Sequence, residues 1–331
     1  MSEQFTADIL QKIKLYLQSD LTGINTWKLG ILPPVPVFPA IAILPTSENT
    51  VKYLSSGQRT TRRVYDLEIH TKGLSVEAVE KKNYELVNKL EELLRTNLNY
   101  NLRDTILDLV IGSPVSQVQP TSIDSSQFIC TSILKVETFS KNYIANRLVG
   151  KTDLNSDTTN ESASYTLLLK LFNFLKVLRT VPVTTYGLAD VVVLEKNEIP
   201  ATAKLPAVLV IQPDYDVNRK WAGMDSQNKR LEIKVLTRAV PQEAQLLQNL
   251  DITKRILQAL EVYTYLSFTD DSRIQMHTIA DYLENQRERI VNSTVVDVQY
   301  DISPDYFYYI TTISLLVETR KEAIFNHPSE R

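Results

Sequence analysis

The 331-residue chain carries one pattern of residues twice, and this repeat constrains the fold more than any other feature of the sequence. Short segments of the first half recur in the second half, in the same order and at similar spacing. A repeat unit as long as a domain predicts two copies of one domain rather than a solenoid. The matched segments are Phe38-Pro39-Ala40-Ile41 with Leu205-Pro206-Ala207-Val208, Lys52-Tyr53 with Lys220-Trp221, Leu67–Lys72 with Ile233–Arg238, Glu77-Ala78 with Glu243-Ala244, and Lys135–Thr138 with Leu316–Thr319.

The domain boundaries follow from the length of the chain and from one polar stretch. A chain of 331 residues is long enough for about two domains. Between residues 151 and 164, Asp, Asn, Ser and Thr dominate, and the few apolar residues there cannot bury enough surface to order the segment. We therefore predict a first domain over residues 1–150, a flexible linker over 151–164 and a second domain over 165–331.

The hydrophobic pattern of the first repeat predicts a succession of helices and strands. Apolar residues at three- and four-residue intervals predict one helix over Thr6–Leu17 and a longer one over Ser75–Arg95, with Ser75 as its N-cap. An unbroken apolar run predicts a strand over Phe38–Leu44 with both faces covered, followed by a polar loop over 45–61. Alternation of apolar and polar residues predicts the next strand, over Val64–His70.

Each repeat closes with two further strands, which gives both repeats the same order of elements. In the first repeat these strands are expected over Ile106–Gln119 and Phe128–Thr138. In the second repeat they are expected over Val295–Ile302 and Tyr306–Thr319, joined by a tight turn at 303–305. Helices set against a largely antiparallel sheet define the α+β class. We therefore predict an α+β fold of two similar domains, each a mainly antiparallel sheet packed against two helices.

Composition argues against several broad classes of protein. Lys and Arg number 36 against 39 Asp and Glu, and the resulting net charge of −3 argues against a dedicated nucleic-acid binder. The single cysteine, Cys130, excludes an internal disulfide framework. No stretch approaches the roughly 20 apolar residues of a membrane span, and the first residues lack the pattern of a signal peptide. We therefore expect a soluble protein with no membrane partner.

The sequence contains no complete motif for enzyme chemistry. Gly150-Lys151-Thr152 resembles the end of a phosphate-binding loop, but Ala145 stands where the earlier glycine is required. His70, His277 and His327 are isolated from one another and match no zinc spacing. The paired aspartates lack the ligand spacing and glycine turn of a calcium loop. We therefore expect no enzymatic activity, no cofactor and no metal site.

Basic and aromatic residues between the first two strands of each repeat form one candidate interaction surface. Positive charge beside an aromatic ring on a protruding hairpin suits contact with a partner protein or with a phosphate backbone. Most such loops are merely solvated, but the recurrence of this one in both repeats favours partner contact. The candidate residues are Lys52, Tyr53, Arg59, Arg62 and Arg63 in the first repeat and Lys220, Trp221, Lys229 and Arg230 in the second.

A run of aromatic residues, Tyr306–Tyr309, forms a second candidate surface. Successive side chains of a strand face opposite sides, so two of these rings must lie off the core face. Exposed Tyr and Phe side chains are typical of interface cores. Two interpretations stay open: contact with another chain through residues such as Tyr306 and Tyr308, or an aromatic cap over the helices.

The order of these signals resembles that of phage tail-terminator and tail-completion proteins, a family also found at the tail end of contractile injection systems. The resemblance rests on the short N-terminal helix, the Pro-Ala-Ile strand at Pro39, the Arg-bearing second strand, the Glu-Ala helix at Glu77 and the closing Val-Glu-Thr strand that ends at Thr138. It covers most of both halves of the chain. The usual form of the family has a single domain, whereas this chain carries the unit twice.

The resemblance implies a structural, non-enzymatic virion protein of the tail or neck that is assembled in the host cytoplasm. It would form a ring that caps the tail tube, ends polymerisation of tube and sheath, and joins the tail to the neck or head connector. Its partners would be other copies of the chain, the tube protein, and the sheath and neck proteins. A ring of six chains is favoured and three is an alternative, since a head-to-tail interface closes when its rotation closes. DNA would pass through the lumen without sequence-specific binding.

Two other classes of function stay open from the sequence alone. A neck or baseplate structural protein can use the same domain at a different level of the particle. A hydrolase or nucleotide-binding protein can assemble its site from residues that are scattered along the chain.

Overall fold

The computed structural model describes most of the chain. The described ranges are residues 6–53, 58–97, 108–121, 126–143, 167–181, 186–194, 204–211, 215–221, 224–239, 242–268, 288–304 and 307–322. The linker that we predict over 151–164 lies outside these ranges, and so do Tyr306, His277 and His327.

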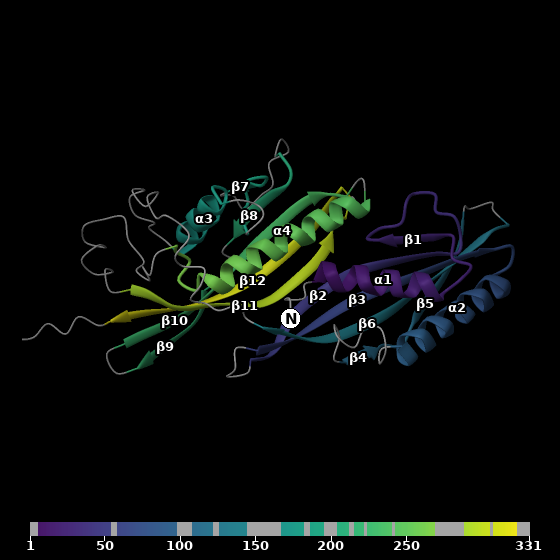
Figure 1. The fold of residues 1–331 in the computed structure, drawn as a ribbon, viewed down its shortest axis with the longest axis horizontal. Helices are drawn as coiled ribbons and strands as arrows, with labels where there is room; N and C mark the ends of the chain where they lie inside the picture. Colours follow the sequence, from purple (N-terminus) through teal and green to yellow (C-terminus); the bar gives the residue numbers. More distant parts are fainter. Residues whose placement is uncertain are drawn as a thin grey trace, which may run out of the picture. The chain divides into compact units, whose positions relative to one another are not determined.

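Among the described residues, both repeats fold into helices and strands (Figure 1). The helices are α1 (Thr6–Asp20), α2 (Val76–Asn97), α3 (Leu167–Leu178) and α4 (Gln242–Val262). The strands are β1 (Thr26–Leu29), β2 (Ala40–Tyr53), β3 (Gln58–Gly73), β4 (Asp108–Ile111), β5 (Val115–Pro120), β6 (Phe128–Tyr143), β7 (Val192–Leu194), β8 (Ala207–Ile211), β9 (Tyr215–Trp221), β10 (Met224–Arg238), β11 (Glu288–Ile302) and β12 (Tyr308–Glu322). Most strand pairs are antiparallel, while β1 with β2 and β7 with β8 are parallel. The predicted α+β class with mainly antiparallel strand pairing is confirmed. The prediction of a separate sheet for each repeat was wrong, because the described strands of both repeats belong to one sheet.

The chain divides into two compact units, and neither is continuous in sequence. Unit 1 comprises Met1–Ile144, Arg238–Leu250 and Gln299–Tyr309, and unit 2 comprises Ala145–Thr237, Asp251–Val298 and Ile310–Arg331. The start of α4, the end of β11 and the start of β12 therefore belong to unit 1. Unit 1 thus draws on both sequence repeats.

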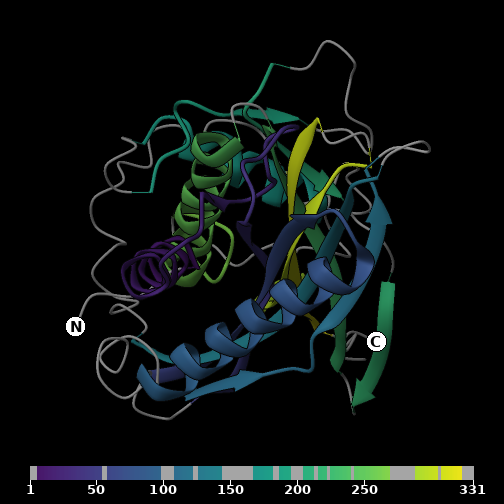
Figure 2. The same ribbon diagram turned by 90° about the vertical axis from the view of Figure 1, so that its right-hand side faces the viewer.

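The part of the sheet that lies in unit 1 is built around a long hairpin. Its strands run in the order β4–β6–β3–β2, with β5 also on β6, β1 beside β2, and β11 following β2. Helix α1 packs on β1 and β2, and α2 packs on β3 and β6. Figure 2 shows α2 lying across the strands. The helices therefore cover the first repeat's part of this sheet.

The hairpin of unit 1 corrects one prediction. Strands β2 and β3 pair as far as Tyr53 opposite Arg59, so most of the polar loop that we predict over 45–61 is strand. The prediction was wrong because it weighed only side-chain polarity. Main-chain hydrogen bonds between antiparallel strands hold a polar segment extended whatever its side chains are.

The apolar segments of the hairpin form the core of unit 1 as the sequence predicts. Each residue of Ala40–Ile43 is 0% exposed, which confirms a strand covered on both faces. In β3 the side chains of Tyr65, Leu67 and Ile69 are also 0% exposed, whereas the residues between them are partly exposed. This alternation is the period-two pattern of a strand with one buried face.

Helix α2 begins and is fixed by polar contacts. The Ala78 N–H donates to Ser75 Oγ at 3.3 Å, which confirms the predicted N-cap. Further along the helix, Asn83 is 1% exposed, and its Nδ2 donates to Ile69 O at 3.0 Å and to Cys130 O at 3.1 Å. The buried amide therefore ties α2 to both β3 and β6.

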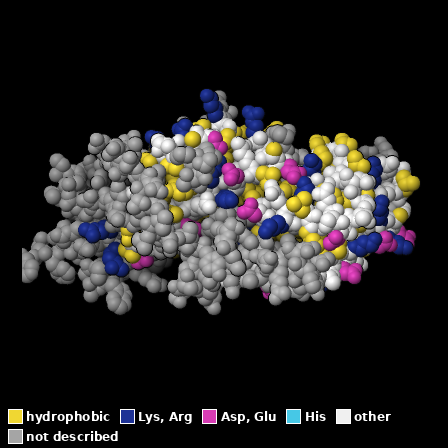
Figure 3. All heavy atoms as spheres, viewed as in Figure 1, with side chains coloured by type: hydrophobic (Ala, Val, Ile, Leu, Met, Phe, Trp, Pro, Cys, Tyr) yellow, Lys and Arg dark blue, Asp and Glu magenta, His cyan; other side chains and the backbone are white. Residues whose placement is uncertain are grey.

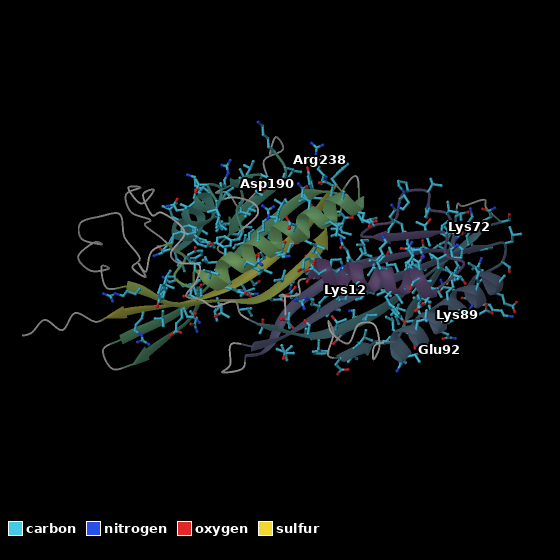
Figure 4. All side chains as sticks on the ribbon, in the orientation of Figure 1. Lys12, Lys72, Lys89, Glu92, Asp190 and Arg238 are labelled. Carbon is cyan, nitrogen blue, oxygen red and sulfur yellow. The ribbon has the colours of Figure 1, made fainter. Side chains whose placement is uncertain are left out.

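Unit 2 has its own apolar and polar contacts. Its strands run β12–β10–β8–β7, with β9 along β10, and α3 packs on β7 and β8. The Phe174 ring stacks on Phe268 with centroids 4.9 Å apart. Arg255, from α4, donates to both carboxylate oxygens of Asp190 at 2.8 and 3.1 Å (Asp190 is labelled in Figure 4), and this hydrogen bonding lowers the pKa of Asp190. The contact of Arg255 with Asp190 therefore fixes α4 to the segment that precedes β7.

The two repeats share the same strand registers. The matched pairs are Thr26 opposite Ala40 and Val192 opposite Ala207 in the parallel pairs, and His70 opposite Ala40 and Leu236 opposite Ala207 in the antiparallel pairs. The peptide bonds Phe38–Pro39 and Leu205–Pro206, which precede these two alanines, are both cis. Residues that the sequence match aligns therefore occupy equivalent places in the two hydrogen-bond ladders.

Gly30, directly after β1, lies where a side chain does not fit. Its φ is +84°, and an ideal Cβ there would lie 2.3 Å from the hydroxyl oxygen of Tyr309. Tyr309 is 3% exposed and accepts a hydrogen bond from Ile31 N at 3.3 Å, so it cannot easily move. Gly23 has nearly the same φ, +85°, but nothing lies within 4 Å of its Cβ position.

We expect Gly30→Ala to destabilise the protein more than Gly23→Ala. The left-handed backbone costs an alanine about 1 kcal/mol at either position, and the clash with Tyr309 adds about 2 kcal/mol at Gly30 alone. The free energies of unfolding of the two variants, measured in urea, check this difference. Equal losses would contradict the close packing of Tyr309 on β1.

Candidate interaction surfaces

The Lys-aromatic pairs lie at the ends of hairpin strands in both repeats. Tyr53 is the last residue of β2 and lies opposite Arg59, while Trp221 is the last residue of β9 and lies opposite Met224. Lys52 and Lys220 directly precede them. The backbone thus places both pairs beside a hairpin turn, although their side chains lie outside those described. Their contact with a partner stays a prediction.

The arginines of the first candidate surface lie in β3, where successive side chains point to opposite faces of the sheet. The side chain of Arg62 is 34% exposed and pairs with Glu137 of β6, with Nε 2.9 Å from Oε2. This hydrogen bond lowers the pKa of Glu137 and raises that of Arg62. The side chain of Arg59 lies outside those described. Arg62 therefore presents an already paired charge at the surface.

Arg63, the next residue, is fully buried in unit 1. It is 0% exposed, and its Nη2 lies 3.1 Å from Glu48 Oε1, a carboxylate that is itself 6% exposed as a residue. Burial acts to lower the pKa of Arg63, but the adjacent Glu48 carboxylate raises it above the ordinary value. Arg63 is therefore not part of the accessible surface and enters no contact proposed below.

The pair of Arg63 and Glu48 is the centre of a buried polar network. Thr6 Oγ1, at the start of α1, accepts from Arg63 Nε at 3.1 Å and donates to Glu48. Ser140 Oγ of β6 accepts from Arg63 Nη1 at 2.5 Å. The Tyr300 hydroxyl of β11 donates to Thr6 Oγ1 at 3.3 Å and to Glu48 Oε2 at 3.4 Å. The network thus joins elements of both repeats inside unit 1, and sequence reasoning missed it.

The basic residues of the second repeat lie in β10. Lys229 is partly exposed and lies opposite Tyr215 of β9. Arg230 is exposed, and its Nη2 lies 3.3 Å from Ser314 Oγ of β12. Both residues remain candidates for contact, on a different strand from Lys220 and Trp221.

The aromatic run divides between core and surface. Tyr309 is 3% exposed and belongs to the core of unit 1, whereas Phe307 is 64% exposed. Tyr308 is partly exposed, and its ring centroid lies 6.5 Å from that of Phe307. Tyr306 lies outside the described residues. Among the described rings, Phe307 is more exposed than the Tyr308 that sequence reasoning selected.

A stripe on α2, which sequence reasoning did not select, exposes large side chains. Val76 is 42% exposed and Tyr84 is 51% exposed, with the partly exposed Glu80 between them at four-residue spacing. Residues four apart on a helix lie on one face. Leu74, just before the helix, is 74% exposed. We call Leu74, Val76, Glu80 and Tyr84 the α2 face.

The loop between β1 and β2 carries another apolar surface. In Figure 3 hydrophobic side chains gather over this loop, where Val35 is 87% exposed and Val37 is 64% exposed. The Thr26 side chain fixes the loop, because its hydroxyl accepts from Val37 N at 3.1 Å and donates to Val37 O at 2.9 Å. The loop therefore presents apolar side chains on a restrained backbone.

Within the described ranges, few side chains are placed to act in catalysis or metal binding. His70 Nδ1 lies 3.0 Å from Thr131 Oγ1, and its Nε2 lies 3.4 Å from Glu68, so the ring is held between side chains of its own sheet. No cluster of three or more His, Cys, Asp or Glu side chains that could hold a metal ion occurs in the described part of the chain. None of the described helices is long and apolar enough to cross a membrane.

Two comparisons with known proteins gave no match. No protein-family model matches the chain, and no curated protein matches it. The function is therefore inferred from the repeat and from the residues on these surfaces.

Proposed function

We propose that this chain is a structural protein of a phage tail or contractile injection system, built as two similar α+β domains in tandem. Copies of the chain form a ring that caps the tail tube, ends polymerisation of tube and sheath, and joins the tail to the neck or head connector. Six chains are favoured over three, and DNA passes through the lumen without sequence-specific contacts. The protein acts by assembly and not by catalysis.

The observation that carries the proposal is the equivalence of the two repeats. Their strand registers coincide at the alanines after Pro39 and Pro206, and both end a hairpin strand on a Lys-aromatic pair. A chain that carries one module twice presents two sets of similar surfaces, which suits head-to-tail association into a closed ring. The resemblance of the module to tail-terminator proteins supplies the place of that ring.

Tyr53→Ala combined with Trp221→Ala is expected to leave the protein folded and to impair its assembly. Aromatic side chains beside a hairpin turn contribute little to a core, whereas an aromatic anchor at an interface typically contributes about 2 kcal/mol, or roughly 30-fold in affinity. Electron microscopy of rings, and of tubes to which the variant is added, measures assembly, and circular dichroism checks the fold. The exposed Lys89→Ala on α2 is the control. Normal assembly of the double variant would remove the hairpin ends from the proposal.

The proposed place in the particle is tested by deleting the gene and measuring tail length. Loss of a tail terminator is expected to give tails of uncontrolled length, because nothing then stops addition of tube subunits. Tails of normal length that fail to join heads would instead indicate a neck protein. Normal, infectious particles would contradict a structural role in the tail.

A further inference from the structure

In the second repeat, the first turns of α4 are covered inside unit 1. Leu246 and Leu250 are each 3% exposed. A Cβ at Gly30 would lie 3.2 Å from Leu246 Cδ2, so the end of β1 packs on this face of the helix. Glu243 Oε1 lies 2.7 Å from Lys14 Nζ of α1. Elements of the first repeat, α1 and β1, therefore cover the start of α4.

In the first repeat, the corresponding face of α2 is exposed. Asn83 and Asn249 are both 1% exposed and place the two helices in register. Tyr84 then stands where α4 has Leu250, yet it is 51% exposed instead of 3%. Val76, two turns earlier on the same stripe, is 42% exposed. The same face is thus covered in one repeat and uncovered in the other.

We infer that the α2 face docks against a second copy of this chain, at the second-repeat elements that correspond to α1 and β1, which are α3 and β7. This inference rests on the proposed ring and names the contact between its chains. Because the repeats share one register, the contact inside unit 1 is a template for the contact between chains. Each added chain leaves the same two surfaces uncovered at the ends, so addition continues until the ring closes.

At the inferred contact between chains, α2 supplies negative charge and α3 supplies positive charge. Helices α4 and α1 do the same at the contact inside unit 1. Within one chain, α1 supplies Lys14 and α4 supplies Glu243. At the contact between chains, α2 supplies the exposed Glu77, which corresponds to Glu243 in the sequence match. Lys176 is exposed on α3, and the exposed Arg179 directly follows this helix. Opposite charges across an interface steer association and fix its register. The favoured occupant of the α2 face is therefore the α3 side of another copy.

The first test replaces the apolar side chains of the α2 face with arginine. Val76→Arg with Tyr84→Arg is expected to weaken association between chains on the order of 100-fold, because an interface core does not tolerate two added charges. The variant is expected to melt like the unchanged protein, since both positions are exposed in the single chain. Leu15→Arg, at a position of α1 that is 66% exposed and outside the inferred contact, is the matched control and stays assembled.

The second test uses cross-linking between two different single-cysteine variants. The chain has one cysteine, Cys130, which is 1% exposed and does not compete. Tyr84→Cys chains mixed and reassembled with Lys176→Cys chains are expected to give a cross-linked dimer of the two species with a bismaleimide. Lys89, labelled in Figure 4, is exposed on α2 away from the α2 face, and Lys89→Cys in place of Tyr84→Cys is expected to give none.

The possible outcomes distinguish failure of the inferred contact from failure of the proposed ring. Loss of assembly in the arginine variant, together with the mixed cross-link, supports the α2 face as the contact. A ring that persists in the arginine variant and gives no mixed cross-link overturns the contact and leaves the ring intact. A cross-link between two Tyr84→Cys chains indicates a two-fold interface and overturns the head-to-tail arrangement. An unchanged protein that stays monomeric overturns both the contact and the ring.

Discussion

Replacing Arg63 with methionine is expected to lower the free energy of unfolding by about 3–5 kcal/mol, because the change leaves a buried carboxylate without its partner. Arg63 is 0% exposed and Glu48 is 6% exposed, so water cannot replace the lost guanidinium. Methionine keeps most of the volume of the side chain, and the effect therefore reports charge and hydrogen bonding more than a cavity. Urea unfolding of Arg63→Met measures it.

The neighbouring Arg62 provides a matched control for this prediction. Arg62 pairs with Glu137 on the opposite, partly exposed face of β3, and such a pair contributes no more than about 1 kcal/mol. We therefore expect Arg62→Met to cost far less than Arg63→Met. The double variant Arg63→Met/Glu48→Met removes both buried charges and is expected to recover part of the loss. If Arg63→Met costs no more than Arg62→Met, the buried network does not stabilise unit 1.

Asn83→Leu is expected to lower the free energy of unfolding by about 3 kcal/mol, because it leaves buried carbonyl groups without donors. The Asn83 amide donates to Ile69 O and Cys130 O, and Ser132 Oγ donates to its Oδ1. Leucine has a similar size, so the loss is mainly that of hydrogen bonds. Thermal and urea unfolding both measure it.

A second asparagine on the same helix serves as the control for this change. Asn88 is exposed on α2, and Asn88→Leu is expected to change stability by no more than about 0.5 kcal/mol. Asn249 occupies the place of Asn83 in α4, is also 1% exposed, and donates to Tyr309 O at 3.2 Å. A similar loss for Asn249→Leu is therefore expected. Losses confined to one of the two helices would show that the repeats differ at this position.

Sequence patterns predicted the helices and strands whose apolar residues recur at a regular spacing. The alternation in β3 gave the inward face at Tyr65, Leu67 and Ile69, and helical spacing gave α1 and α2. Extended two residues towards the N-terminus, the same alternation places Arg63 on the inward face. The cluster of basic residues instead suggested a surface for partner contact. The partner of Arg63, Glu48, becomes visible only with the register of the hairpin, which a single sequence does not contain.

Other features depended on contacts between distant segments. Strand β1 has only four residues, too few for any period to be read, and it exists because it pairs with β2. Tyr300 and Glu243 contribute to unit 1 although they lie in the second repeat. A boundary drawn at a polar linker assigns each residue to its own repeat, and so it cannot reveal a side chain that packs on the other one. The α2 face was overlooked for the same reason. Whether its side chains are exposed depends on which elements pack on the helix, and a single sequence does not contain those contacts.

Electron microscopy of the purified 331-residue chain at a series of concentrations tests directly whether the tandem module assembles head to tail. We expect closed rings in which each chain contributes two similar densities, so that a ring of six chains shows twelve. Chains that remain monomeric at every concentration, or rings whose densities do not come in similar pairs, would contradict a tandem module that assembles head to tail.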